Sequence, residues 1–282
     1  MKNLFFLMVL SALIINGSVT HAANRLLYEN FDDQVLDSRL IPRVYGLWGE
    51  EDGVNQGDEY TLNQVGYNGK GYCFTSTTEV PKNECFLAWE NRAGYTPLPS
   101  PWPTNEWYVS FWVRYPTFTK TVNHENIKLF YPRWDGGDSH TAFDDTGGGA
   151  LYHSEKSAGE YVTNSNWISV PGINDGNWHR VEFYMNMERG ISRFWYDGDL
   201  KWDKNWGPGT WRTPFSMYYF TFGSIDASGD SIFNRQFDEI EVWDGMPNAD
   251  GVTDPDPTPA PPEPTPDPIL PPVLHSPITN SN

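Results

Sequence analysis

Apolar and polar residues alternate with period two through much of the chain between residues 24 and 247, and this pattern most constrains the fold. A period of two places one set of side chains on each face of an extended strand, whereas a helix needs a period of 3.6. No amphipathic helical pattern longer than two turns interrupts the alternation. The apolar sets of the two clearest strands are Val109, Phe111 and Val113, and Val181, Phe183 and Met185. The folded part is therefore expected to consist of strands.

Further strands are expected in the segments RLLYENF, GYCFTST, ECFLAWE, NIKLFYP, GALYHSE, GISRFWYDGD, MYYFTFGS and FDEIEVWD. Asp197-Gly198 ends one of them and is a typical hairpin turn pair. Phe, Trp and Tyr make up 16% of the residues, and there are 25 Gly and 23 Pro, which favours short strands joined by turns. About ten or more short strands without intervening helices predict a sandwich or a closed barrel.

The segment GNWHRVEFYMNMERGISRFWYDGDL resembles the paired strands of laminin-G-like and related concanavalin A-like domains. GYNGKGYCF and EWYVSFWVRYP precede it and FDEIEVWDG follows it in the order that those domains show. The resemblance implies an all-β fold, a two-sheet antiparallel jelly-roll β-sandwich. The concanavalin A-like lectin/glucanase superfamily contains lectins, glycoside hydrolases and polysaccharide lyases, so the fold alone does not select a function.

The two ends of the chain differ in composition from its middle. Residues 1–22 hold an apolar run too short to span a bilayer, followed by small residues, which predicts a cleaved signal peptide. Residues 23–247 are the expected jelly-roll domain. Residues 248–282 are rich in Pro, Asp and Thr and lack aromatic residues, which predicts a disordered tail or linker. We expect a secreted protein, extracellular or periplasmic, with a bacterial type of signal peptide.

An exported chain with two cysteines, Cys73 and Cys85, favours one disulfide that closes a hairpin-sized loop. The alternative is a pair of buried thiols. The net charge of −18 argues against binding to nucleic acid or to an anionic membrane. We expect a monomer whose partner is a polysaccharide.

The polar sides of the strands predict where that partner binds. If strands 107–115, 126–131, 178–187 and 191–197 share one curved inner sheet, they line its concave side with cations and aromatic rings. The predicted carbohydrate-binding residues are Trp112, Arg114, Lys128, Tyr184, Arg193 and Trp195. Arg and Lys pair with uronate or sulfate groups and aromatic rings stack on sugars, which favours an extended, anionic polysaccharide. The alternative is that charges such as Arg180 and Glu182 pair with one another.

A polysaccharide lyase that cleaves a uronate polymer by β-elimination is the main alternative function. It needs a cation to neutralise the carboxylate and a base to remove the neighbouring proton. The candidates are Arg114 and Lys128 for the first role, and Tyr184, Tyr131, His124 and His153 for the second. A laminin-G-like adhesion module that binds through loops is the second alternative. Hydrolysis would need two carboxylates on one face of a strand. Glu239 and Glu241 share a face, but they lie in what resembles the closing strand of the domain, so a structural role is favoured over hydrolysis.

Jelly-roll carbohydrate proteins often hold one structural calcium ion between their first and last strands. The resemblance implies Glu29 and Asp238 as its first ligands, with Asp32 or Asp33 as substitutes at the start. No His/Cys cluster has the spacing of a zinc site. No organic cofactor is expected.

Overall fold

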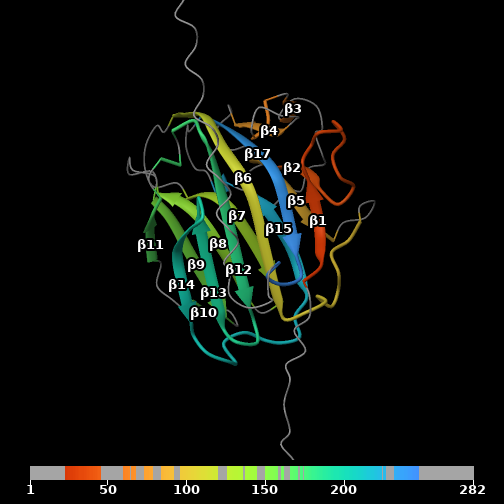
Figure 1. Cartoon of the computed structure of the whole chain (residues 1–282), viewed down its shortest axis with the longest axis vertical. Helices are drawn as coiled ribbons and strands as arrows, with labels where there is room; N and C mark the ends of the chain where they lie inside the picture. Colours follow the sequence, from red (N-terminus) through yellow and green to blue (C-terminus); the bar gives the residue numbers. More distant parts are fainter. Residues whose placement is uncertain are drawn as a thin grey trace, which may run out of the picture.

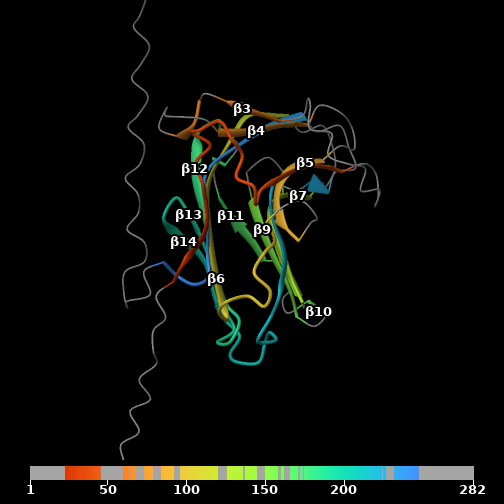
Figure 2. The same cartoon turned by 90° about the vertical axis from the view of Figure 1, so that its right-hand side faces the viewer.

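A computed structural model describes residues 23–45, 60–63, 65–67, 73–78, 84–91, 96–119, 126–135, 137–144, 150–157, 160–161, 166–170, 172–173, 175–223, 225–226 and 232–247. Within these ranges the chain forms strands and turns and contains no helix that could cross a membrane. The strands make two antiparallel sheets that face one another (Figures 1 and 2). The predicted all-β, two-sheet antiparallel sandwich is confirmed.

Sheet A has the strand order β14-β13-β12-β6-β17-β4-β3, and β1 also pairs with β17. Its strands are β1 (Arg25–Glu29), β3 (Tyr60–Asn63), β4 (Cys73–Thr78), β6 (Glu106–Thr119), β12 (Trp178–Asn186), β13 (Ile191–Tyr196), β14 (Asp199–Asn205) and β17 (Ile232–Trp243). In Figure 1 this sheet lies in front of the other. Figure 2 shows β3 and β4 lying across one end of the sandwich, which is called the β3–β4 end below.

Sheet B has the order β10-β9-β8-β7-β15-β5-β2, with β11 paired to β9 and β16 to β7. Its strands are β2 (Ile41–Tyr45), β5 (Glu84–Glu90), β7 (Asn126–Trp134), β8 (Gly137–Asp144), β9 (Ala150–Ser157), β10 (Glu160–Tyr161), β11 (Asn166–Ser169), β15 (Met217–Phe222) and β16 (Ile225–Asp226). The sequence patterns did not predict β2, β3, β8, β10, β11, β14 or β16, several of which are very short.

A core rich in phenylalanine fills the space between the sheets. Phe111 and Phe183 of sheet A meet Phe130 and Phe222 of sheet B, with ring centroids 4.7 Å apart for the stacked pair Phe130 and Phe183. Such aromatic pairs add about 0.5–1.5 kcal/mol each beyond the area that they bury. The apolar sets predicted for β6 and β12 all point into this core, which confirms the alternation.

The hairpin between β13 and β14 turns at Asp197 and Gly198, which have φ angles of 51° and 80°. Two consecutive positive φ values are the signature of a type I′ turn, whose twist suits a two-residue hairpin. The predicted turn is confirmed, and it fixes the register of β13 on β14 from Tyr196 opposite Asp199.

The sequence analysis placed residues 126–131 in the same sheet as 107–115, and this is wrong. Residues 126–131 belong to β7 in sheet B, whereas 107–115 belong to β6 in sheet A. Both sheets have one apolar face, so alternation identifies the buried side of a strand but not the sheet that contains it. Lys128, opposite Ala142 of β8, is therefore separated from the other five predicted sugar-binding residues.

The predicted disulfide between Cys73 and Cys85 is not formed in this structure. Cys73 is a buried thiol whose Sγ donates to the carbonyl of Val65 at 3.5 Å. The two cysteines lie on different sheets, Cys73 in β4 and Cys85 in β5. The expected hairpin between them is not formed, because β4 pairs with β3 and β17 whereas β5 pairs with β2 and β15.

The first and last strands lie side by side at the edge of the domain. The Asp244 carboxylate accepts hydrogen bonds from the backbone N–H of Asn24 at 2.6 Å and from its side-chain amide at 3.0 Å. Residues 1–22 and 248–282 lie outside the described residues, so the signal peptide and the disordered tail stay predictions.

Candidate functional site

The face of sheet A that points away from the core carries polar and aromatic residues in cross-strand rows. One row toward the β3–β4 end contains Thr75, Gln236, Arg114 and Trp178. The next row contains Asp238, Trp112 and Arg180. Residues directly opposite on paired strands have Cβ atoms about 4.5–5.5 Å apart, so each row is a continuous line of neighbouring side chains.

Arg114 is the most available cation in these two rows. Its Nε donates to the carbonyl of Gly176 at 2.6 Å, and among the described residues this is the one hydrogen bond that it makes. Arg114 and its cross-strand neighbour Trp178 are both partly exposed. Arg114 and Trp178 are therefore accessible cross-strand neighbours on this face.

Trp112 is covered by another ring. The phenol of Tyr67 stacks on the indole with ring centroids 3.6 Å apart and planes 16° apart, and Trp112 is only 8% exposed. Trp178 touches the edge of the same phenol at 6.5 Å. The sequence predicted Trp112 correctly as an outward residue, but in this structure its face is occupied.

Gln236 carries an unsatisfied polar atom. The side chain is 5% exposed, and its Oε1 has no hydrogen-bond partner, whereas its Nε2 donates to Thr75 Oγ1 at 3.4 Å. Buried carbonyl oxygens are almost always paired with a donor. Gln236 lies directly opposite Arg114, and its Oε1 can accept a hydrogen bond from a hydroxyl group or a water.

The next row along the sheet is internally paired. The buried Glu182, 1% exposed, accepts a hydrogen bond from the Tyr108 hydroxyl at 2.5 Å and lies 3.4 Å from Arg180 Nη2. The alternative that Arg180 and Glu182 pair with one another is confirmed. Arg180 is thus less available than Arg114 for an anion.

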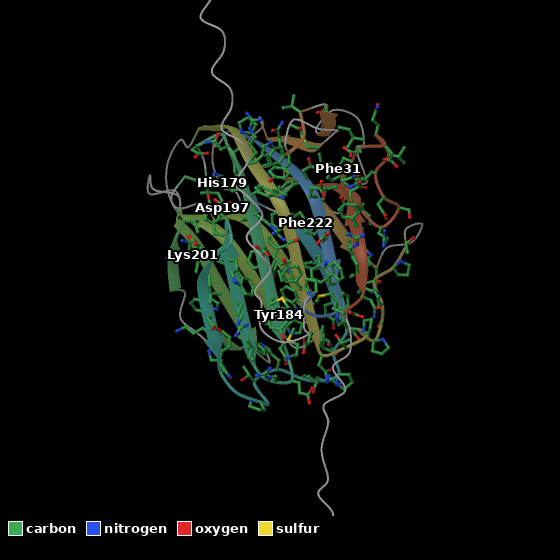
Figure 3. All side chains as sticks on the ribbon, viewed as in Figure 1. Phe31, His179, Tyr184, Asp197, Lys201 and Phe222 are labelled. Carbon is green, nitrogen blue, oxygen red and sulfur yellow. The ribbon has the colours of Figure 1, made fainter. Side chains whose placement is uncertain are left out.

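Of the three further predicted residues on this face, Tyr184 and Arg193 lie opposite one another near its other end, and Trp195 lies opposite Glu182 in the middle of the sheet. Figure 3 shows Tyr184 far from the β3–β4 end, where His179 lies. Tyr184 is six positions beyond Trp178 along β12, which is about 20 Å at ~3.3 Å per residue. One sugar ring therefore cannot contact both Arg114 and Tyr184.

These three side chains make internal contacts. The Tyr184 hydroxyl donates to Glu106 Oε2 at 3.0 Å, and Arg193 Nε is 3.1 Å from Asp203 Oδ1. Trp195 is 1% exposed. Burial, together with the nearby Glu106 carboxylate, raises the pKa of Tyr184 well above its usual value, which makes it a poor base.

The lyase candidates are divided between the sheets. Arg114 and Tyr184 belong to sheet A, whereas Lys128, Tyr131 and His153 belong to sheet B. His124 lies outside the described residues. On sheet B the partly exposed Tyr131 packs its ring against Tyr219, with centroids 5.5 Å apart. The pairing of Arg114 with Tyr184 as neutraliser and base is excluded by their separation along the sheet.

The two residues expected to bind calcium, Glu29 and Asp238, are buried beside the paired β1 and β17. Glu29 accepts the backbone N–H groups of Phe31 and Asp37, each at 2.7 Å. Asp238 accepts those of Tyr67 at 2.7 Å and Glu239 at 2.8 Å.

Burial raises the pKa of both groups, that of Asp238 to about 7, so their charges are poorly compensated by the protein. A cation would supply that compensation. The described residues contain no cluster of three acidic, His or Cys ligands, so backbone carbonyls would have to complete the shell. Calcium stays a prediction.

Tyr67, Trp178 and Gln236 were missed as site residues. Trp178 has the same parity along its strand as Arg180 and Glu182, so the alternation contained the signal for it. Gln236 lies on the last strand, whose pairing with β6 the sequence does not reveal. Tyr67 comes from a loop, and nothing in its local sequence indicates that it lies over Trp112.

No protein-family model matches the chain, and no curated protein sequence matches it. Among solved structures, the chain is similar to one described as showing that cell entry of botulinum neurotoxin type C is dependent upon interaction with two ganglioside molecules. The TM-score is 0.53 at 12% identity, over 79% of this chain and 48% of that one. The binding domain of botulinum neurotoxin DC, in complex with rat synaptotagmin II, gives 0.52 at 12% identity over the same shares.

A third similar structure is the cellulose-induced protein Cip1, with a TM-score of 0.51 at 15% identity, over 77% of this chain and 96% of that one. The chain therefore spans less than half of the neurotoxin chains but nearly all of Cip1. At these identities the likeness shows a common fold.

Proposed function

We propose that this chain is an exported carbohydrate-binding β-sandwich, of the concanavalin A-like type, that holds an extended polysaccharide on the outer face of sheet A. The observation that carries the proposal is the pair Arg114 and Trp178, which lie directly opposite one another and are both partly exposed. Arg114 has terminal nitrogens without a partner among the described residues.

The chemistry of this pair favours an acidic sugar. A guanidinium binds a uronate carboxylate with two parallel hydrogen bonds, and an indole stacks on the apolar face of a pyranose. The protein as a whole has a net charge of −18, so an anionic polymer would be repelled everywhere except at a local cation. Arg114 would then decide where the polymer binds, and binding would weaken with added salt.

The structural neighbours support carbohydrate binding in general. The type C neurotoxin is described as interacting with gangliosides, which carry sugars, and Cip1 is named for its induction by cellulose. A secretory leader at residues 1–22 and a Pro-rich tail at 248–282 suit a monomeric protein that meets polysaccharides outside the cell.

The test is a binding panel with the purified protein. Alginate, glucuronan, pectate, heparin, chondroitin and neutral β-glucans are immobilised in native gels, and the retardation of the wild type is compared with that of three variants. We expect R114A and W178A to bind an acidic polymer about tenfold more weakly. R193A, which removes a cation held by Asp203 at the opposite end, is the matched control and should bind as the wild type does.

Equal binding by R114A and the wild type would exclude the uronate contact. Absence of binding to every polymer would exclude the proposed function and favour an adhesion module that binds through its loops. The same samples are followed by absorbance in the ultraviolet band of unsaturated uronates, because a rise with one acidic polymer would identify a lyase.

A further inference from the structure

A short segment crosses the outer face of sheet A over the proposed site. Residues 65–67, called the strap below, contact successive strands of the sheet. The carbonyl of Val65 accepts from Cys73 Sγ of β4 at 3.5 Å, and the N–H of Tyr67 donates to Asp238 of β17 at 2.7 Å. The Tyr67 ring then reaches Trp112 of β6 and the edge of Trp178 of β12.

The Tyr67 ring lies where a sugar ring would lie on an exposed tryptophan. Its plane is within 16° of the indole plane, and its centroid is 3.6 Å from the indole centroid. A pyranose stacks on an indole face-on in the same manner, through its apolar C–H face. The phenol therefore occupies an aromatic sugar subsite from within the chain.

A second, independent observation points to a ligand at this place. Gln236 Oε1 is buried without a partner, and Gln236 lies opposite Arg114 and next to Asp238 on β17. A buried acceptor without a donor is costly, and a sugar hydroxyl is a donor of suitable size. Gln236, Trp112 and Arg114 lie in adjoining rows, within reach of one pyranose unit and its carboxylate.

We infer that Tyr67 is a removable cover of a saccharide subsite on Trp112, and that a uronate ring replaces it. In the occupied state the ring stacks on Trp112, one hydroxyl donates to Gln236 Oε1, and the carboxylate binds Arg114. The inference rests on the proposed function, which needs only Arg114 and Trp178, and extends it by a covered subsite and by the residue that covers it.

The cover lowers the apparent affinity, because only the fraction of molecules with Tyr67 displaced can bind at this subsite. Removing the phenol removes that penalty. The Y67A variant is therefore expected to bind more tightly than the wild type, which is the opposite of what truncating a contact residue does.

The experiment measures dissociation constants by calorimetry with oligosaccharides of the acidic polymer that binds best in the panel. We expect Y67A to bind about tenfold more tightly than the wild type and Y67L to bind more tightly by a smaller factor, and we expect W112A and Q236L to bind about tenfold more weakly. Y218A, which removes a tyrosine that is 46% exposed on sheet B, is the control and should not change the constant. Thermal unfolding of each variant identifies any that fail to fold. If Y67A fails to fold, Y67L replaces it in the test, because leucine keeps some apolar volume over the indole.

The outcomes separate the two proposals. If the wild type binds through Arg114 but Y67A and Y67L bind equally well or more weakly, the cover is overturned and the proposed function stands. If neither the wild type nor Y67A binds any polymer, the proposed function falls and the cover falls with it.

Discussion

Nδ1 of the His179 imidazole lies 2.8 Å from Oδ2 of Asp197, the first residue of the turn between β13 and β14 (Figure 3). Its other nitrogen, Nε2, lies 3.1 Å from Asp175 Oδ1. A histidine can donate a hydrogen bond to a carboxylate at each of its ring nitrogens only when both nitrogens are protonated. The three side chains thus connect the loop before β12 to the β13–β14 turn.

This arrangement predicts a loss of stability at alkaline pH. Burial alone would lower the pKa of His179, but the bonds to Asp197 and Asp175 outweigh it, and the pKa is raised above 6.5. The stabilisation is therefore complete below pH 6.5 and is lost as the pH rises through the raised value. We expect H179Q to cost about 1–3 kcal/mol near pH 6 and much less near pH 9. Thermal unfolding of both proteins across this range measures the difference, and parallel curves would contradict the prediction.

Gly190 and Gly207 form a matched pair for backbone substitution. Both have positive φ, 68° and 88°, but a Cβ on Gly190 would lie 2.0 Å from the carbonyl oxygen of Gly207, whereas a Cβ on Gly207 would meet nothing within 4 Å. We expect G207A to cost about 1–2 kcal/mol from the left-handed conformation alone. G190A should cost about 3 kcal/mol or more, because backbone must also move. Denaturant unfolding measures the loss of stability in both variants. Equal losses would contradict the prediction, because they would show that the backbone at Gly190 and Gly207 can move apart at no cost in stability.

Tyr184 is expected to be a stability residue and not a sugar ligand. Its hydroxyl donates to the partly buried Glu106, whose pKa is raised by desolvation. Removal of that donor in Y184F should cost about 1–3 kcal/mol. This lowers the melting temperature by roughly 2–4 °C per kcal/mol. Polysaccharide affinity should not change. A loss of affinity without a loss of stability would return Tyr184 to the binding site.

Calcium should stabilise the protein if Glu29 and Asp238 hold it. Millimolar calcium would then raise the melting temperature of the wild type over that in chelator, through mass action on the folded state. The double variant E29Q/D238N should show no such rise, because amides bind calcium more weakly than carboxylates. An unchanged wild-type melting temperature would show instead that these carboxylates serve only the backbone N–H groups of Phe31, Asp37, Tyr67 and Glu239.

The paired strands around Val181 and Phe194 show how far local pattern reaches. Alternation identified their buried faces, and Asp197-Gly198 identified the turn that leads from β13 to β14, because side-chain direction and turn type depend on a few adjacent residues. The same pattern identified Trp112 and Arg114 as outward neighbours. It grouped Lys128 with them wrongly, since the chain crosses to the other sheet between β6 and β7.

The sequence alone determined the all-β class, the inward and outward residues of the main strands, and the composition that suits export and sugar binding, since all of these follow from local periodicity and content. Tertiary structure decided which outward residues meet. Strand order brought Gln236 of the last strand beside Arg114, hydrogen bonds on the outer face joined Tyr184 to Glu106 and Glu182 to Tyr108, and a loop placed Tyr67 on Trp112. Contacts between residues far apart in the chain depend on how whole sheets pack, and no local pattern encodes that.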